Sequence, residues 1–170
     1  MVIGPESTGK SFLCEQLSAH FNCTWCPEFA REFLLREGNR YDYDDLLEIA
    51  RGQVQMEDRS IEQSESRHPF LFIDTDMYVM KVWAEFVFGK CHRYILEQTA
   101  QRRYDLYLLC NTDLPWVKDE LREYPDLETR KILFNIYKDI MVNQDTPWVE
   151  IKGLEEERFS IAKDAIQKLS

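Results

Sequence analysis

The sequence is short of positive charge and of long apolar runs. It carries 21 Lys and Arg against 31 Asp and Glu, which gives a net charge of −10 at pH 7. A chain this acidic is not expected to present a broad surface to nucleic acid or to an anionic membrane, because both partners are themselves negative. No apolar run approaches the roughly 20 residues that span a bilayer. Any phosphate that the protein binds must therefore be held by a local motif.

The cysteines give no sign of a disulfide framework. There are five of them, an odd number, and no secretory signal precedes them, which indicates a reduced, cytoplasmic protein. Cys23 and Cys26 have C-x-x-C spacing, but no second pair follows to complete a zinc site. We therefore favour strand packing over metal or redox chemistry for this pair.

Length and pattern favour one domain over residues 1–170. The chain is close to the roughly 150 residues of an average domain, and it shows no repeat, low-complexity stretch or linker. The first apolar segment holds only Met1 to Ile3 before a glycine, whereas strands usually run about five or six residues. Further residues or another domain before Met1 are therefore compatible with the pattern.

Short apolar runs alternate with longer amphipathic segments, which is typical of an α/β fold with a parallel sheet. Five strands are predicted, at 1–3, 24–26, 70–74, 104–110 and 147–151. Helices are predicted between them, most clearly at 10–21, 130–142 and about 154–169, where apolar residues recur at helical spacing. The clearest stripe is assigned to the core and comprises Ile132, Leu133, Ile136, Tyr137, Ile140 and Met141.

One motif carries specific chemistry. Residues 4–11, GPESTGKS, match G-x-x-x-x-G-K-[ST] between a predicted strand and a predicted helix. In such a phosphate loop the backbone N–H groups converge on phosphate oxygens at a helix N-terminus. We expect Lys10 to reach the β and γ phosphates of a nucleoside triphosphate and Ser11 to hold Mg²⁺. The expected nucleotide-binding residues of this segment are Gly4, Glu6, Ser7, Thr8, Gly9, Lys10, Ser11 and Phe12.

The loop alone does not specify a reaction, since kinases, GTPases and motor ATPases all use it. The sequence holds no N-K-x-D guanine motif, which weakens the GTPase interpretation. FLFIDTD ends a buried strand in Asp74, which suits a second Mg²⁺ contact, with a helix N-cap as the alternative role. Asp76 lies two residues further on and is a candidate to face a hydroxylated substrate, with a structural role equally open.

The end of the second strand adds two more candidates. Ligands of an open parallel sheet lie beyond the carboxyl ends of its strands. Glu28 would then face the phosphate loop, where it could orient or deprotonate a substrate hydroxyl, and Arg31 could bind substrate or phosphate. A capping carboxylate and a solvated ion pair are the alternatives.

Residues 111–130 are polar and punctuated by proline, and we expect them to form a lid. Arg122 and Arg130 are placed where a lid could fold over the γ-phosphate. The planar fork of arginine suits the charge that spreads over the transferring oxygens, and a closed lid excludes water from the acceptor hydroxyl. Surface solvation is the alternative for both arginines.

Together these landmarks resemble one family, the P-loop ribosylnicotinamide kinases of the NadR type and their stand-alone AAA-like relatives. GPESTGKS, PEFAREF, FIDTD and LPWVKDELR occur in the family's order over nearly the whole chain. The resemblance implies a nucleoside- or nucleotide-kinase-like αβα fold of three layers with a five-stranded parallel sheet. It also implies transfer of the ATP γ-phosphate to the 5′-hydroxyl of nicotinamide riboside, which yields the mononucleotide in NAD salvage.

The resemblance extends to individual positions. Asp74 would support the metal, Glu28 and Asp76 would meet the ribose or its 5′-hydroxyl, and Trp116 would mark the lid entrance, with packing as its alternative. Arg122 and Arg130 would be the lid arginines.

There is one departure from the family. Its NadR-type members carry an aromatic residue, typically Trp, just before the glutamate at the end of strand two, where it stacks on the nicotinamide ring. Here that position is Pro27. Trp25 is expected on another face of the strand and is not an obvious substitute, so nicotinamide specificity does not follow.

The leading hypothesis is an ATP- and Mg²⁺-dependent small-molecule kinase acting on a nucleoside. Its expected catalytic residues are Lys10, Glu28, Asp74 and Arg122. An ATP-sensing regulatory module, or a P-loop ATPase without nucleoside kinase activity, stays open as an alternative. A homodimer or a fused upstream domain is compatible with the sequence, and neither a nucleic acid nor a membrane is an expected partner.

Overall fold

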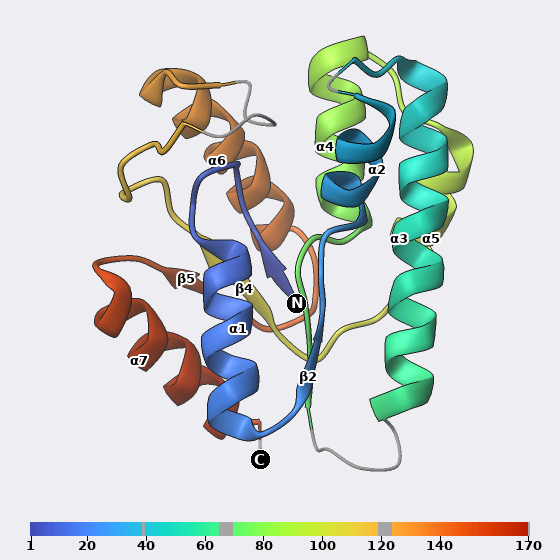
Figure 1. Ribbon diagram of the computed structural model, residues 1–170. Helices are drawn as coiled ribbons and strands as arrows, with labels where there is room; N and C mark the ends of the chain where they lie inside the picture. Colours follow the sequence, from blue (N-terminus) through green and yellow to red (C-terminus); the bar gives the residue numbers. More distant parts are fainter. Residues whose placement is uncertain (39, 65–69, 119–123, 170) are drawn as a thin grey trace.

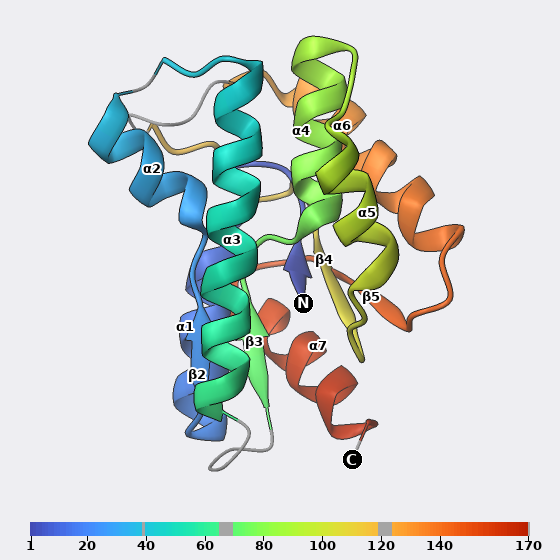
Figure 2. The same ribbon diagram turned by 90° about the vertical axis from the view of Figure 1, so that its right-hand side faces the viewer.

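The computed structural model describes residues 1–38, 40–64, 70–118 and 124–169 of the chain, which form parallel strands flanked by helices (Figures 1 and 2). The strands in this part of the chain are β1 (Val2–Ile3), β2 (Thr24–Cys26), β3 (Leu71–Ile73), β4 (Tyr107–Cys110) and β5 (Trp148–Ile151). The helices are α1 (Lys10–Phe21), α2 (Phe29–Glu37), α3 (Tyr43–Ser64), α4 (Met77–Phe88), α5 (Arg93–Gln101), α6 (Leu127–Val142) and α7 (Glu155–Gln167).

The strands form two parallel sheets. One sheet has the strand order β1-β4-β5, and the other joins β2 to β3. A single parallel bridge between Val2 and Asp74 connects them, which gives the overall order β2-β3-β1-β4-β5. The five predicted strands are all present and parallel. However, one continuous five-stranded sheet was expected, and the larger of the two sheets has three strands. The reason is that β1 contributes only two residues, too few to pair fully with neighbours on both sides.

Alternation along the strands divides the core between two helical layers. Val2 and Leu108 pack in a cluster with α1 and α7, whereas Ile3 and Leu109 pack in a cluster with α4 and α6. Adjacent strand residues point to opposite faces of a sheet, so each short strand supplies both layers. The predicted three-layer αβα architecture is therefore confirmed. A further cluster joins α2, α3, α4 and α5.

One predicted core stripe is only half correct. On α6, Leu133, Tyr137 and Met141 are buried, but Ile132 and Ile136 are 53% and 36% exposed. Successive helical residues are about 100° apart, so a stripe two residues wide cannot bury both of its edges against one sheet. Apolar periodicity located the helix and overestimated its buried face.

Candidate functional site

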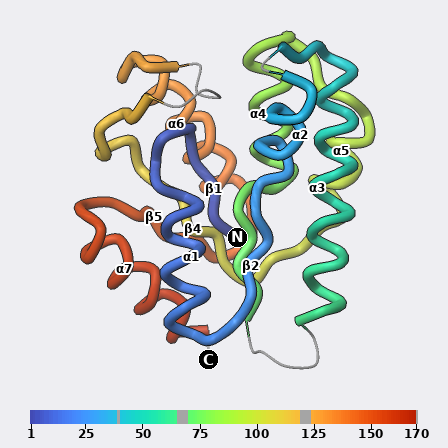
Figure 3. Tube along the Cα trace, viewed as in Figure 1, coloured from blue at the N-terminus to red at the C-terminus, as the bar shows by residue number. Residues whose placement is uncertain are grey.

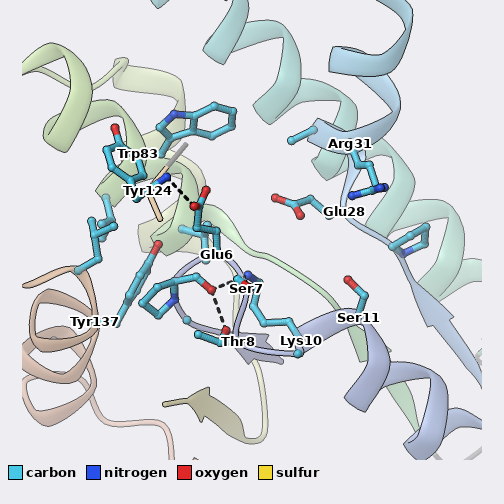
Figure 4. A pocket seen from close by; sticks show the side chains of 18 of the residues that line it. Glu6, Ser7, Thr8, Lys10, Ser11, Glu28, Arg31, Trp83, Tyr124 and Tyr137 are labelled. Atoms are coloured by element: carbon cyan, nitrogen blue, oxygen red, sulfur yellow. Dashed lines mark hydrogen bonds between the residues drawn. The ribbon is translucent and has the colours of Figure 1, made fainter. Parts of the chain in front are cut away.

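A cavity of about 600 Å³ opens beside the phosphate loop (Figure 4). All eight predicted nucleotide-binding residues of positions 4–12 line it, together with Pro5. One wall is formed by the end of β2 and the start of α2, with Pro27, Glu28 and Arg31. The facing wall belongs mainly to α4 and α6 and includes Trp83 and Tyr137. The site therefore combines a phosphate-binding floor with a partly aromatic chamber.

The phosphate loop has a backbone that requires its glycines. Figure 3 follows it from β1 into α1, beside the first turns of α6. Gly4 has φ of +141°, and a Cβ atom there would lie 2.7 Å from the carbonyl oxygen of Cys110 in β4. The carbonyl of Pro5 accepts hydrogen bonds from the hydroxyl of Thr8 at 2.7 Å and from Nζ of Lys10 at 3.1 Å. These contacts hold the loop closed around the start of α1.

The hydroxyl of Ser11 donates to Oδ2 of Asp74 at 2.5 Å. Asp74 directly follows β3 and is fully buried, so this contact joins the first turn of α1 to the end of a neighbouring strand. Hydroxyl and carboxylate oxygens suit Mg²⁺, which is usually bound by one or two protein groups together with substrate phosphates and water. The described residues contain no cluster of three or more His, Cys, Asp or Glu that could hold a metal unaided. The pair therefore fits a Mg²⁺ ion that arrives with a nucleotide.

The carboxylates of Glu28 and Asp74 both lie near the ammonium group of Lys10. Burial raises the pKa of Glu28, and Lys10 opposes that rise while Asp74 adds to it. Burial likewise raises the pKa of Asp74, with Lys10 and the Ser11 hydroxyl opposing it. Burial is the largest influence on the pKa of both groups and favours their protonated forms. Glu28 is therefore a stronger proton acceptor than an exposed glutamate. Figure 4 shows it pointing into the cavity from the α2 side.

Asp76 does not meet the expectation that it faces the substrate. It is 1% exposed and caps α4, where Oδ1 accepts from the backbone N–H of Val79 at 3.1 Å. Its other oxygen accepts from the hydroxyl of Tyr107 at 2.9 Å, and burial raises its pKa to about 6. The capping role considered for Asp74 thus belongs to Asp76.

The predicted lid contacts the phosphate loop where the structure describes it. Oε1 of Glu6 accepts from the backbone N–H of Tyr124 at 2.7 Å and from Nε1 of Trp116 at 3.3 Å. Trp116 is not among the described residues that line the cavity. Arg122, predicted to be catalytic, lies outside the described residues.

Arg130 is a structural link between the lid segment and the loop. It is 2% exposed, which excludes the solvated alternative. One of its terminal nitrogens donates to the carbonyls of Ser7 at 3.2 Å and Leu114 at 3.3 Å. Like Trp116, it is absent from the described lining of the cavity.

Sequence reasoning missed Arg158 in α7. This arginine is 4% exposed and donates to the carbonyls of Thr8 at 2.8 Å and Asn111 at 2.8 Å, while it forms an ion pair with Asp113. It therefore ties the phosphate loop to the residues that follow β4. No motif surrounds it, so the sequence offers no local signal for this role.

The aromatic wall was also missed, because Tyr137 belongs to the helical stripe that we assigned to the core and no motif marks Trp83. The indole N–H of Trp83 donates to the hydroxyl of Tyr41 at 2.9 Å, and the two rings meet edge to face at 4.9 Å. Trp25 also lines the cavity, as does Pro27. The expectation that Trp25 lies on another face was wrong, since residues two apart on a strand share a face.

The paired cysteine spacing has the packing role that we favoured. Cys23 and Cys26 are both free thiols, and Cys26 is buried. Burial raises the pKa of Cys26 to about 11, so its thiolate is scarce near neutral pH. Separately, none of the helices in the described ranges is both long enough and apolar enough to pass through a membrane.

Comparison with known proteins gives one family match and several relatives. A family model described as an AAA domain matches residues 1–158. The trifunctional NAD biosynthesis/regulator proteins NadR of Salmonella typhimurium and Escherichia coli are 27% and 28% identical over 155 residues, which is 89% of this chain. The chain spans 37% of the length of each.

Two solved structures share the fold. A NadR protein crystallised in complex with NR superposes with a TM-score of 0.82 at 22% identity, over 99% of this chain and 48% of that one. A NadR protein in complex with NAD and AMP-PNP gives a TM-score of 0.78 at 23% identity, with the same coverage of both chains.

Proposed function

Since the chain belongs to the AAA domain family, we propose that it is an ATP-dependent kinase that phosphorylates the 5′-hydroxyl of nicotinamide riboside or a closely related nucleoside. Residues 1–170 would form its single kinase domain. Support comes from the NadR relatives, which are named for NAD biosynthesis, and from the NadR complexes with NR and with AMP-PNP. A cytoplasmic location is part of the proposal and fits the free cysteines of the described residues.

The observation that carries the proposal is that Glu28 shares one cavity with Lys10 and Ser11. A module that only binds or hydrolyses ATP needs the phosphate loop but has no use for an acceptor chamber beside it. Here the chamber adjoins the loop and has a carboxylate on one wall and aromatic rings on the other (Figure 4). That arrangement favours transfer to a bound small molecule over transfer to water.

The chain's own groups divide the work of phosphoryl transfer. Lys10 neutralises charge on the β and γ phosphates, and the Ser11–Asp74 pair supplies oxygens for a metal. Mg²⁺, when bound, would screen the negative charge of the phosphates. Glu28 accepts a hydrogen bond from the acceptor hydroxyl and orients it for in-line attack. Because this transfer depends mainly on positioning and electrostatics, orientation is the larger part of the role of Glu28.

The acceptor's base would lie against Trp83. The indole of Trp83 is held by a hydrogen bond to Tyr41, so the substrate does not have to order this ring. A pyridinium base is flat and positively charged, and aromatic faces attract such cations. Glu6 and Glu28 line the same cavity and add negative charge. The α4 wall can therefore supply the aromatic surface that Pro27 does not.

The decisive experiment incubates the protein with ATP, Mg²⁺ and a panel of nicotinamide riboside, uridine, adenosine and no acceptor. Chromatography should detect the 5′-mononucleotide of nicotinamide riboside, and Lys10→Ala should abolish it. Equal phosphate release with and without acceptor would instead identify an ATPase. ATP binding without turnover of any acceptor would favour the sensor.

A further inference from the structure

The backbone takes an unusual conformation between the two aspartates that follow β3. Thr75 has φ of +75°, in the left-handed region that β-branched residues rarely enter. Its side chain is 1% exposed, so this is not a feature of a loose surface loop. Such strain persists only where surrounding contacts hold it, and it concentrates at functional sites.

Neighbouring strands fix this conformation from both sides. The N–H of Asp74 donates to the carbonyl of Cys26 at the end of β2, at 2.9 Å. The N–H of Thr75 donates to the carbonyl of Val2 in β1, at 3.1 Å. Thr75, with its left-handed backbone, therefore lies where the two sheets meet.

The conformation separates two acids that an extended strand would place on one side. Residues two apart on a strand share a face, so Asp76 would follow Asp74 toward Ser11 if Thr75 were extended. Instead Asp74 accepts from Ser11, while Asp76 accepts from the N–H of Val79 in α4. One carboxylate is thus directed to the phosphate loop and the other to the helix cap.

The Thr75 hydroxyl lies between two carboxylates of the site. It contacts Oδ1 of Asp74 at 3.4 Å, on the oxygen that Ser11 does not use. The same hydroxyl lies near enough to Glu28 to favour the charged form of that carboxylate, which opposes the rise that burial causes in its pKa. One hydroxyl proton serves one acceptor at a time, so Thr75 connects the proposed metal side of the site to the proposed acceptor side.

We infer that Thr75 is a positioning residue of the phosphoryl-transfer site: its left-handed backbone separates Asp74 from Asp76, and its hydroxyl links Asp74 to Glu28. The inference rests on the proposed kinase function for its effect on turnover. Its effect on the Ser11–Asp74 pair does not need an acceptor and can be measured independently.

Three substitutions separate the hydroxyl from the backbone. Thr75→Ser keeps the hydroxyl, and Thr75→Val keeps the branched shape without it. Thr75→Gly also removes the hydroxyl, but glycine adopts positive φ freely, so this variant remains informative if the valine variant does not fold. The first readout is the Mg²⁺ concentration that half-saturates binding of a non-hydrolysable ATP analogue, measured by calorimetry. The second is kcat and KM for nicotinamide riboside.

The serine variant is expected to match the parent within about twofold. The valine and glycine variants are expected to raise the half-saturating Mg²⁺ concentration at least about tenfold and to lower kcat by a similar factor, the usual effect of losing one hydrogen bond to a charged group. Parent-like Mg²⁺ dependence in both hydroxyl-free variants would overturn the inference. If the parent phosphorylates no riboside, the proposed function fails, while the Mg²⁺ comparison still decides the role of Thr75.

Discussion

Ser11 donates its hydroxyl proton to Asp74 at 2.5 Å, across 63 residues of sequence. The bond joins the phosphate loop to the strand end beside it, and both partners carry the oxygens that suit Mg²⁺. The positions of the two groups are therefore already set in the protein alone.

Replacing either partner of this pair should remove Mg²⁺-dependent turnover. Ser11→Ala and Asp74→Asn are each expected to lower kcat/KM for ATP at least about a hundredfold, because charge neutralisation at the phosphates is a large part of this catalysis. The double variant should be little worse than either single one, since residues that act as a unit are not additive. Steady-state kinetics of all four proteins measure this, and additive losses would show that the residues act separately.

Glu28→Gln should affect turnover more than nucleotide binding. The amide keeps the size of the side chain but removes the negative charge that orients the acceptor hydroxyl, and we expect kcat to fall about ten- to a hundredfold. The KM for ATP should change less than about twofold. Initial rates over a grid of ATP and riboside concentrations separate the two effects. An unchanged kcat would remove Glu28 from the transfer step.

Trp83→Ala should raise the KM for the riboside about tenfold and leave the KM for ATP unchanged, since a stacking or cation–π contact contributes on the order of 1–2 kcal/mol. Trp83→Phe should recover part of the loss. Ile132→Ala, on the exposed face of α6, is the matched control for an apolar truncation outside the cavity. If the KM for the riboside is the same in Trp83→Ala and in the control, the base does not bind at this wall.

Arg158→Leu should weaken nucleotide binding although Arg158 does not line the described cavity. Its buried guanidinium donates to the carbonyl of Thr8 and pairs with Asp113, whose side chain is 35% exposed, so the main loss is the donor to a buried carbonyl, which costs about 1–3 kcal/mol. Urea unfolding should show a loss of this order, and calorimetry should show weaker ATP binding. Exposed Arg93, which pairs with Glu97 on α5, provides the control substitution, whose effect on both measurements should be small.

Thiol reactivity should follow burial and depend on pH. Burial raises the pKa of Cys26 to about 11 and that of Cys110 to about 12, so their thiolates are scarce at pH 8. A chromogenic disulfide reagent should therefore modify the partly exposed Cys23 and Cys91 first. Modification of the buried thiols should require denaturant or a markedly higher pH. Rapid reaction of Cys26 in the native protein at pH 8 would contradict this order.

Local patterns predicted the elements of this fold well, and the directions of individual side chains less well. The strand at 24–26 and the helix at 10–21 were placed correctly, because apolar runs and the phosphate-loop motif are local signals. Asp76 was predicted to face the substrate, because the sequence FIDTD gives no indication of the positive φ of Thr75.

The remaining errors have a related cause. Arg158 reaches Thr8 from 150 residues away, and Trp83 lines the cavity from α4, which packs beside α6. A helical stripe indicates that a side chain is covered. It does not indicate whether the covering surface is another helix or a bound molecule.

The carboxylate of Glu6 belongs to the phosphate loop and accepts hydrogen bonds from both Trp116 and Tyr124. This contact places nucleotide binding and the contact of Trp116 and Tyr124 with the loop in one thermodynamic cycle. Coupling between two binding events is reciprocal. If this contact changes the affinity for nucleotide by some factor, nucleotide binding must change the equilibrium for the contact of Trp116 and Tyr124 with Glu6 by the same factor.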